Sequence, residues 1–343
     1  MTEYGVKNRD LIDKWLDFKL IDQGKSKTTV SKYRVNLEKF IDYLESSKLS
    51  VLSVTRDNLK EFCGMHLFKL GLSPRTRTTF VSAVKGLFKW LYAEGIRSDN
   101  PGYDLVHPEY GKRLPRVMQL DHAKKLIKVP DMNTFMGVRD AAILGVLMGC
   151  GLRVSGVSGL NRSSLIFQDM DNGYESLFLR VIEKGDKERI APAPAETMLL
   201  MRAYLGHPEL SDYDRSINND DQVLFVATNR NIPPCDFHGE ATRLGVGGIF
   251  RMIKRHGEAC GLPGDVLHPH ALRHMFGMEL AESDVDIKEI QLLMGHAHIS
   301  TTTIYLHLAM RKLAKKVQDS SPISKIDTPV TPFLNDLKSK KRK

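Results

Sequence analysis

The run Ala141–Leu152 is almost uninterruptedly apolar and has the composition of a helix. A helix that is hydrophobic on every side must be buried, because none of its faces meets water favourably. Arg153 follows the run directly. An arginine at that place either reaches back to the surface along its aliphatic stem or is held for a binding partner, and the run alone leaves both interpretations open.

Residues 8–95 show the periodicity of four amphipathic helices, whose aromatic and aliphatic stripes we interpret as core. The second helix is expected to begin at Ser26 or Thr28, the third at Thr55, and the fourth at Ser73-Pro74, with proline in the first turn. The stripes are Leu11, Trp15, Phe18 and Ile21; Val30, Tyr33, Leu37, Phe40 and Leu44; Leu59 and Phe62; and Val84, Leu87, Phe88 and Leu91.

Two of these helix starts combine hydroxyl and cationic side chains, which suits phosphate binding at a helix N-terminus. An ordinary capped, solvated helix end explains each cluster equally well. The candidate DNA-binding residues are Lys25, Lys27, Thr28, Arg75 and Arg77.

The chain divides by composition into residues 1–101, a polar linker at 102–115, a second domain at 116–317 and a basic tail at 318–343. The second domain is expected to be mainly helical. Its clearest strands are Leu177–Ile182 and Glu188–Pro192, which turn at Gly185-Asp186 and place Lys184 at the lip of a hairpin. Residues 206–222 are polar and are expected to form a surface loop.

The bulk composition fits a globular protein with a polyanionic partner. The 343 residues suffice for two cores, and the net charge of +9 is a weak indication of nucleic acid. The four cysteines form no Cys-x-x-Cys pair, which argues against a disulfide framework and a thiolate zinc site. Neither a signal peptide nor a spanning segment is visible, so we expect a soluble, cytoplasmic, nucleoid-associated protein.

Six residues along the second domain together suit one reaction. Two arginines, two histidines and a lysine can stabilise charge on phosphate oxygens and move protons, and a tyrosine can attack the phosphorus without a metal. They are, in chain order, Arg153, Lys184, His270, Arg273, His296 and Tyr305.

Each of these residues alone has a plain structural explanation. His270 can be a capping or core histidine, although the spacing of His270 and Arg273 places both on one face of a helix. Lys184 can be an ordinary turn residue, and Tyr305 a packing residue. Their order and neighbours give the set its weight.

That ordered set resembles the tyrosine recombinases, the phage-integrase and Xer family. The resemblance extends over residues 8–317, including the N-terminal helices, which resemble the family's SAM-like core-binding domain. The matching segments are Gly151-Leu152-Arg153-Val154-Ser155, Glu183-Lys184-Gly185-Asp186-Lys187-Glu188-Arg189, His270-Ala271-Leu272-Arg273-His274, Leu293-Met294-Gly295-His296 and Ser300-Thr301-Thr302-Thr303-Ile304-Tyr305.

The resemblance implies a mainly α fold, with a four-helix domain followed by an α+β catalytic domain that carries a small sheet or hairpin. It also implies that Tyr305 forms a 3′-phosphotyrosine and releases a 5′-hydroxyl. Arg153 and Arg273 then clamp the phosphate with help from His296. Lys184 protonates the leaving oxygen, and His270 assists deprotonation of the tyrosine. No metal, cofactor or ATP is expected.

As partners, the resemblance implies duplex DNA with specific recombination sites, clamped between the two domains, and a homotetramer assembled on that DNA that works through a Holliday junction. Whether an accessory protein is needed is left open. A segment after the tyrosine is expected to dock on a neighbouring protomer, with Ala309–Val317 and the apolar group Phe333, Leu334 and Leu337 as candidates. The terminal Lys-Arg run is expected to contact DNA non-specifically.

One position departs from the family pattern. Three residues after the first arginine the family usually has an acid, and here Gly156 stands. Support for Arg153 must then come from elsewhere. Together with the irregular tail, this departure favours a mobile-element integrase over the alternative, an Xer-like chromosome or plasmid dimer resolvase.

Four other classes of protein compete with this interpretation. A metal hydrolase would need His268, His270, His274, His296 and His298 to gather, but no metal-binding spacing is present. A non-catalytic DNA-binding protein of the same fold would not need all six positions filled. A type IB topoisomerase or a telomere resolvase shares the chemistry, but the Xer-like size and hairpin favour a recombinase.

Overall fold

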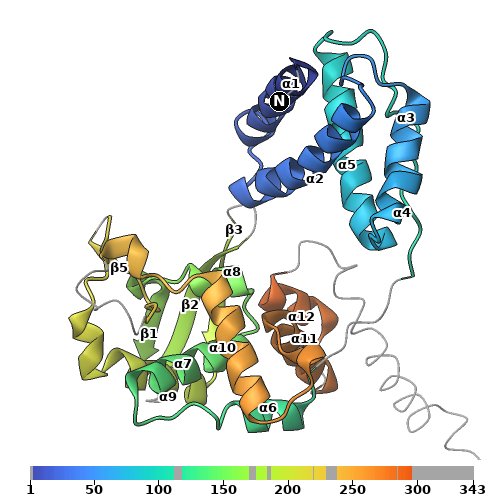
Figure 1. The fold of residues 1–343 in the computed structure, drawn as a ribbon. Coiled ribbons are helices and arrows are strands. Elements are labelled where there is room, and N and C mark those ends of the chain that lie inside the picture. The colour runs from blue at the N-terminus through green and yellow to red at the C-terminus, as the bar shows by residue number, and fades with distance from the viewer. Residues whose placement is uncertain are drawn as a thin grey trace, which may run out of the picture. The chain divides into compact units, whose positions relative to one another are not determined.

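The computed structural model describes residues 3–111, 118–169, 175–183, 187–218, 220–228, 238–283 and 285–295. Contacts divide the chain into an N-terminal unit, Met1–Arg113, and a C-terminal unit, Leu114–Lys343. The described part is mostly helical with small antiparallel sheets, which confirms the predicted fold class (Figure 1).

The N-terminal unit consists of helices around an aromatic core that includes Trp15, Phe40 and Phe88. The elements are α1 (Glu3–Leu20), α2 (Lys27–Ser46), α3 (Arg56–Glu61), the π-helical η1 (Phe62–His66), α4 (Leu67–Lys69) and α5 (Pro74–Ala93). The third expected helix is thus continuous in sequence but contains a π-helical turn. Its widened turn carries Phe62, which is fully buried, into contact with Phe40, their ring centroids lying 4.9 Å apart.

Side-chain caps fix where these helices begin. Ser26 accepts from the Thr29 amide, and Ser73 accepts from the Thr76 amide behind the proline at the start of α5. The predicted starts at Ser26 and Ser73 are confirmed, as is the start at Thr55, which is the N-cap residue of α3. The interpretation of Ile21 as core is wrong: α1 ends at Leu20, and the Ile21 side chain is 75% exposed.

The C-terminal unit combines helices with a three-stranded antiparallel sheet of order β1-β2-β3. Its α-helices are α6 (Leu120–Leu126), α7 (Phe135–Gly149), α8 (Val154–Ser158), α9 (Ala195–Leu205), α10 (Val246–Ala259), α11 (Pro269–Glu282) and α12 (Ile287–Met294). Its strands are β1 (Leu165–Asp169), β2 (Glu175–Glu183), β3 (Lys187–Ala193), β4 (Ser216–Ile217) and β5 (Asp221–Gln222). Short 3-10 helices are η2 (Arg162–Ser164), η3 (Pro208–Asp212), η5 (Gly239–Thr242) and η6 (Gly264–Val266).

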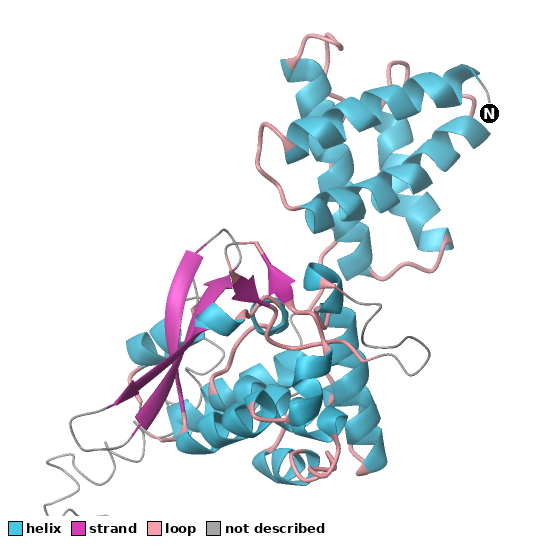
Figure 2. Cartoon of the chain, turned by 90° about the vertical axis from the view of Figure 1, so that its left-hand side faces the viewer, coloured by secondary structure: helices cyan, strands magenta, loops and turns pink. Residues whose placement is uncertain are grey.

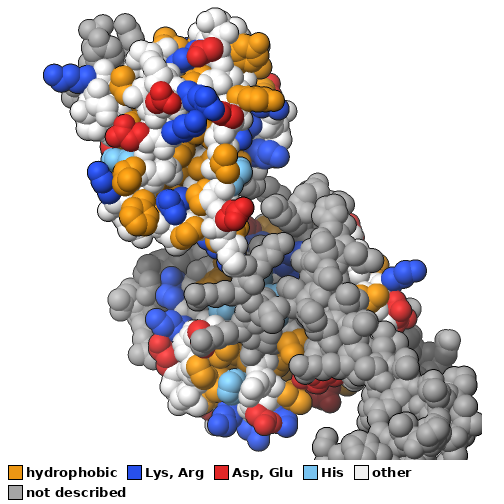
Figure 3. Space-filling view, turned by 90° about the vertical axis from the view of Figure 1, so that its right-hand side faces the viewer, with side chains coloured by type: hydrophobic (Ala, Val, Ile, Leu, Met, Phe, Trp, Pro, Cys, Tyr) orange, Lys and Arg blue, Asp and Glu red, His pale blue; other side chains and the backbone are white. Residues whose placement is uncertain are grey.

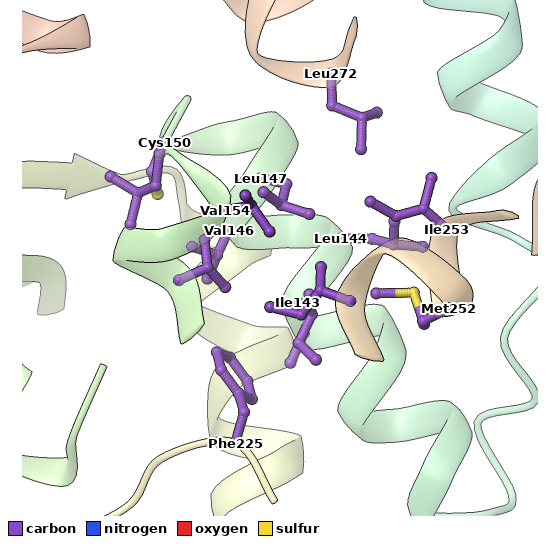
Figure 4. Close-up of a cluster of buried hydrophobic side chains, with 14 of the residues drawn as sticks. Ile143, Leu144, Val146, Leu147, Cys150, Val154, Phe225, Met252, Ile253 and Leu272 are labelled. Carbon is purple, nitrogen blue, oxygen red and sulfur yellow. The ribbon is translucent and has the colours of Figure 1, made fainter. Parts of the chain in front are cut away.

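The predicted buried helix is α7, which contacts α8, α9 and α11. Ile143, Leu144 and Leu147 are fully buried, and Figure 4 shows them among side chains from α10 and α11. Asp140 on the same helix is buried and accepts hydrogen bonds from Arg139, Arg255 and His256. These contacts tie α7 to α10, because a buried carboxylate is tolerated only when it is paired.

The sheet extends the predicted hairpin. β2 and β3 pair over the two expected strands, while β1, which the sequence analysis did not foresee, pairs along the other edge of β2. β2 also contacts α8 and α9, so the sheet lies along one side of the helices (Figure 2). The interpretation of residues 206–222 as a loop is incomplete, because the segment contains η3 and the paired strands β4 and β5.

None of the helices in the described ranges is both long and apolar enough to span a membrane.

Candidate active site

Arg153 lies where the chain leaves the buried helix α7. α7 ends at Gly149, and Gly151 adopts φ 58°, a conformation that side chains rarely take. A Cβ at Gly151 would collide with the ring of Phe276 on α11. Position 151 therefore requires glycine. Because this glycine has no side chain, Phe276 of α11 can lie against the turn that leads to Arg153. Arg153 itself is extended, at φ −68° and ψ 146°, and is the N-cap residue of α8.

The second part of the site is the beginning of α11. His268 caps the helix by accepting from the Ala271 amide at 3.1 Å, and Pro269 occupies the first turn. The predicted helix start is confirmed, and the capping histidine is His268 rather than His270. His270 and Arg273 follow one turn apart; His270 is exposed and Arg273 is only 3% exposed.

Three arginines from three elements meet the C-terminal end of α12. Arg153 donates to the Gly295 carbonyl at 3.1 Å, and Arg189 of β3 donates to the Leu293 carbonyl at 2.8 Å. Arg273 donates to the Met294 carbonyl and, at 2.5 Å, to the Gly151 carbonyl. The last carbonyls of a helix carry partial negative charge and have no partner within the helix, so guanidinium groups are favourable there.

The position at which the family usually has an acid is occupied by Gly156. Gly156 is buried in α8, and a Cβ at this position would lie 2.8 Å from Cγ1 of Val181 on β2. A side chain at position 156 therefore requires Val181 or its surroundings to shift. Among the contacts described for Arg153 is its hydrogen bond to the Gly295 carbonyl.

Sequence reasoning missed Arg189 as part of this cluster. Strand alternation alone could not identify it, because only the structure shows that Arg189 pairs in register with Val181 and shares a face of β3 with Ala191, and that both of those side chains are buried. A cation on the inward face of a strand requires a partner.

The electrostatics of the site reflect its cations and its partial burial. Desolvation and then the charge of Arg189 lower the pKa of Arg153, and desolvation lowers that of Arg189. Burial raises the pKa of the neighbouring Cys150 thiol to about 12, which keeps it neutral. Desolvation, followed by the charge of Arg273, lowers the pKa of His270 below 6.5. At neutral pH the His270 imidazole is therefore uncharged and able to accept a proton.

The structure thus brings Arg153, His270 and Arg273 to one place, while Lys184, His296 and Tyr305 lie outside the described residues. Two of the three have described neighbours in the chain: Lys184 falls between β2 and β3 in the sequence, and His296 directly follows Gly295, whose carbonyl Arg153 contacts. The histidines considered for a metal include His296 and His298, which also lie outside. Among the described residues, no group of three or more potential ligands is arranged to hold a metal.

The candidate DNA-binding residues of the N-terminal unit lie at the beginnings of α2 and α5. These helices pack together and are joined by a hydrogen bond from Asn36 to Thr79 at 3.3 Å. Lys25, Lys27, Thr28 and Arg75 are exposed. Figure 3 shows one face of this unit, on which basic side chains lie among exposed hydrophobic ones.

Arg77 differs from the other four candidates. Its guanidinium lies over the ring of Phe68, 5.7 Å from the centroid. Its Nε is buried and has no hydrogen-bond partner among the residues that the structure describes.

Comparison with known proteins decides the family. Residues 116–312 match the Phage integrase family, and residues 12–95 match the phage integrase N-terminal SAM-like domain. The chain belongs to the phage integrase family. The tyrosine recombinase XerD of Proteus mirabilis is 32% identical over 324 residues, covering 94% of this chain and 96% of that protein. XerD of Staphylococcus epidermidis is 29% identical over 314 residues, covering 91% and 98%.

Solved structures share the fold of this recombinase. The XerH recombinase in a post-cleavage complex with difH substrate has a TM-score of 0.63 at 20% identity, covering 84% of this chain and 79% of that one. The Tn1549 transposon integrase in complex with transposon right end DNA has a TM-score of 0.61 at 17% identity, covering 88% and 99%. The family assignment makes the chain an enzyme of site-specific DNA cleavage and rejoining.

Proposed function

We propose that this recombinase cleaves each DNA strand through Tyr305, forming a 3′-phosphotyrosyl bond and releasing a 5′-hydroxyl. The observation that carries the proposal is the arginine cluster at the end of α12, directly before His296 in the sequence. An attacking phenolate and a phosphodiester in the transition state are both anionic, so a fixed group of cations lowers the barrier to their reaction.

The roles proposed for the individual residues follow from their chemistry. Arg153 and Arg273 stabilise the non-bridging oxygens, because each guanidinium has five N–H donors and can hold a carbonyl and a phosphate oxygen together. His296 donates a further hydrogen bond, and Lys184 protonates the departing 5′-oxygen. The phosphotyrosyl bond conserves the energy of the broken phosphodiester, so rejoining needs neither ATP nor a metal.

His270 fits the role of proton acceptor for the tyrosine. A phenol has a pKa near 10, so attack at neutral pH needs a base or cationic surroundings. His270 is exposed at the start of α11 and shares its face with Arg273. Its lowered pKa favours the neutral base.

The exposed candidates on α2 and α5 support DNA binding by the N-terminal unit. Both helices begin with the same Ser-x-x-Thr cap, in which the two hydroxyls lie 2.9 Å apart. The free amides and hydroxyls of the two first turns, together with Lys27 and Arg75, suit phosphate contacts. Arg77 would reach a phosphate only by leaving Phe68, or would act by orienting that turn.

We propose that four protomers assemble on two duplexes and pass through a Holliday junction. An apolar groove of about 450 Å³ between α6, α7, α9 and α11 supports this assembly. Ile127, Met148, Leu200 and Phe276 line it, with Lys124 at its edge. Its occupant would be the segment after Tyr305 of a second copy, from Ala309–Val317 or from the apolar group Phe333, Leu334 and Leu337.

Two biological tasks fit this chemistry. Relatives named XerD that match over nearly the whole chain favour the Xer-like dimer resolvase. The preference for a mobile-element integrase loses one of its two arguments, because Gly156 is explained by packing against Val181. The other argument for an integrase, the irregular C-terminal tail of the sequence, remains. The fold likeness to the Tn1549 integrase is compatible with either task.

A nicked suicide substrate tests the reaction. The nick lies a few nucleotides 3′ of the scissile phosphate, so the short fragment that carries the released 5′-hydroxyl diffuses away. The covalent complex therefore accumulates and is detected by denaturing electrophoresis. Wild-type protein is expected to form the complex in EDTA, and Tyr305→Phe is expected to form none while binding DNA normally. Cleavage by Tyr305→Phe at the wild-type rate, or loss of cleavage in EDTA, would overturn the proposal.

A further inference from the structure

Arg189 connects two parts of the site that are far apart in sequence. It stands on β3, five positions after Lys184, and it donates to the Leu293 carbonyl at the end of α12 at 2.8 Å. The side chain is partly buried and shares its face of the strand with the buried Ala191. The contact therefore joins the hairpin to the turn of α12 that precedes His296.

The three hydrogen bonds at α12 form a series. Arg189, Arg273 and Arg153 reach the consecutive carbonyls of Leu293, Met294 and Gly295. The helix is also anchored by the side chains of Ile290 and Met294, which are buried in a small cluster with Ala281. Removal of the Arg189 donor would leave the first of these carbonyls without that contact and would loosen the last turn of the helix.

We propose that Arg189 is a positioning residue for strand cleavage, which holds the C-terminal end of α12 and thereby sets the placement of the Arg153 and Arg273 guanidinium groups that bind the same turn. The inference rests on the proposed cleavage by Tyr305. Arg189 is proposed to act through these groups, because the hydrogen bond described for it goes to the Leu293 carbonyl of α12.

Single-turnover cleavage by Arg189→Met is the first part of the test. Methionine keeps much of the apolar stem and removes the donors. Because small misplacements of catalytic groups slow reactions strongly, cleavage of ordinary DNA is expected to slow by about 10- to 100-fold at unchanged DNA affinity. Arg180→Met is the matched control, since Arg180 lies on β2, is half exposed and pairs only loosely with Glu188 at 3.6 Å. The control is expected to cleave at the wild-type rate.

A substrate with sulfur in place of the 5′-bridging oxygen distinguishes an effect of Arg189 on the arginines at α12 from an effect on proton donation by Lys184. A thiolate leaves without a proton donor, so this DNA is expected to rescue Lys184→Ala but not Arg189→Met. Hydrogen exchange of the peptide covering α12 supplies a readout independent of catalysis. Loss of one hydrogen bond is expected to speed exchange there roughly fivefold, with peptides of α7 unchanged.

The outcomes distinguish this inference from the proposed function. An unchanged cleavage rate, unchanged exchange at α12, or rescue of Arg189→Met by the sulfur substrate would overturn the positioning role. If wild-type protein forms no covalent complex, the proposed function fails, and the exchange measurement still decides whether Arg189 holds α12. If Arg189→Met does not fold, Arg189→Lys takes its place, with partial retention of both cleavage and protection expected.

Discussion

Gly156→Ala tests whether packing against β2 is what excludes a side chain at this position. The added methyl would lie 2.8 Å from Cγ1 of Val181, which lies on β2 and is 1% exposed. Valine is stiff about χ1, so it cannot simply turn away. The overlap is expected to cost about 1–3 kcal/mol, against a helix-propensity gain of up to about 1 kcal/mol. We expect the free energy of unfolding to fall by about 1–2 kcal/mol.

A double-mutant cycle isolates that contact. Val181→Ala alone removes two buried carbon groups and is expected to cost about 2 kcal/mol. The space it leaves accepts the new methyl, so Gly156→Ala should be neutral or stabilising in that background, with a coupling energy of about 1–2 kcal/mol. Urea unfolding, with the midpoint and slope fitted for each protein, gives the free energy of unfolding of the wild type, the two single variants and the double variant.

Gly247→Ala is the control for helix propensity. Gly247 lies in the first turn of α10, where a Cβ would meet only the far end of Arg251 at 3.6 Å. This change should be neutral or slightly stabilising. A Gly156→Ala protein as stable as wild type, or a cycle without coupling, would refute the packing explanation for the absent acid.

Three further predictions concern proton transfer, DNA binding and the helix start. Because His270 must be neutral to accept a proton and its pKa is lowered, single-turnover cleavage should stay constant from pH 8 to 6.5 and fall only below pH 6.5; a fall that begins above pH 7 would contradict this. Arg75→Ala should weaken DNA binding at every sequence and reduce the slope of log K against log salt by about 1, whereas Lys14→Ala, which breaks an exposed pair with Asp10 on α1, should leave the slope unchanged. His268→Ala should lower the free energy of unfolding by about 1 kcal/mol through loss of the α11 cap, as measured by urea unfolding, and His268→Asn should retain most of it.

Much of the helical architecture was predictable because its signals are local. The apolar run before Arg153 predicted the buried α7, and Ser26 and Ser73 marked helix starts through their own hydrogen bonds. The failures occurred where tertiary contacts decide. Ile21 fits the stripe of α1 but lies just beyond the helix end, and β1 is defined by its pairing with β2.

In the candidate site, too, residues with local sequence signals were predictable and tertiary contacts were not. Arg153, His270 and Arg273 were recognisable from their neighbours, and the structure brings them together. What holds them was not recognisable, because the partners are backbone carbonyls of α12, which carry no mark in the sequence. Arg189 required knowledge of which face of β3 is buried, and Gly156 required knowledge that Val181 lies against it.

The most direct test of the central claim is to find the residue that carries the DNA. Wild-type protein would be trapped on the suicide substrate in EDTA, digested with nuclease and protease, and analysed by tandem mass spectrometry. We predict a single nucleotide-bearing peptide, with the phosphate on Tyr305 and linked to the 3′ side of the nucleotide. Attachment at any other residue, or through a 5′ phosphate, would contradict the account.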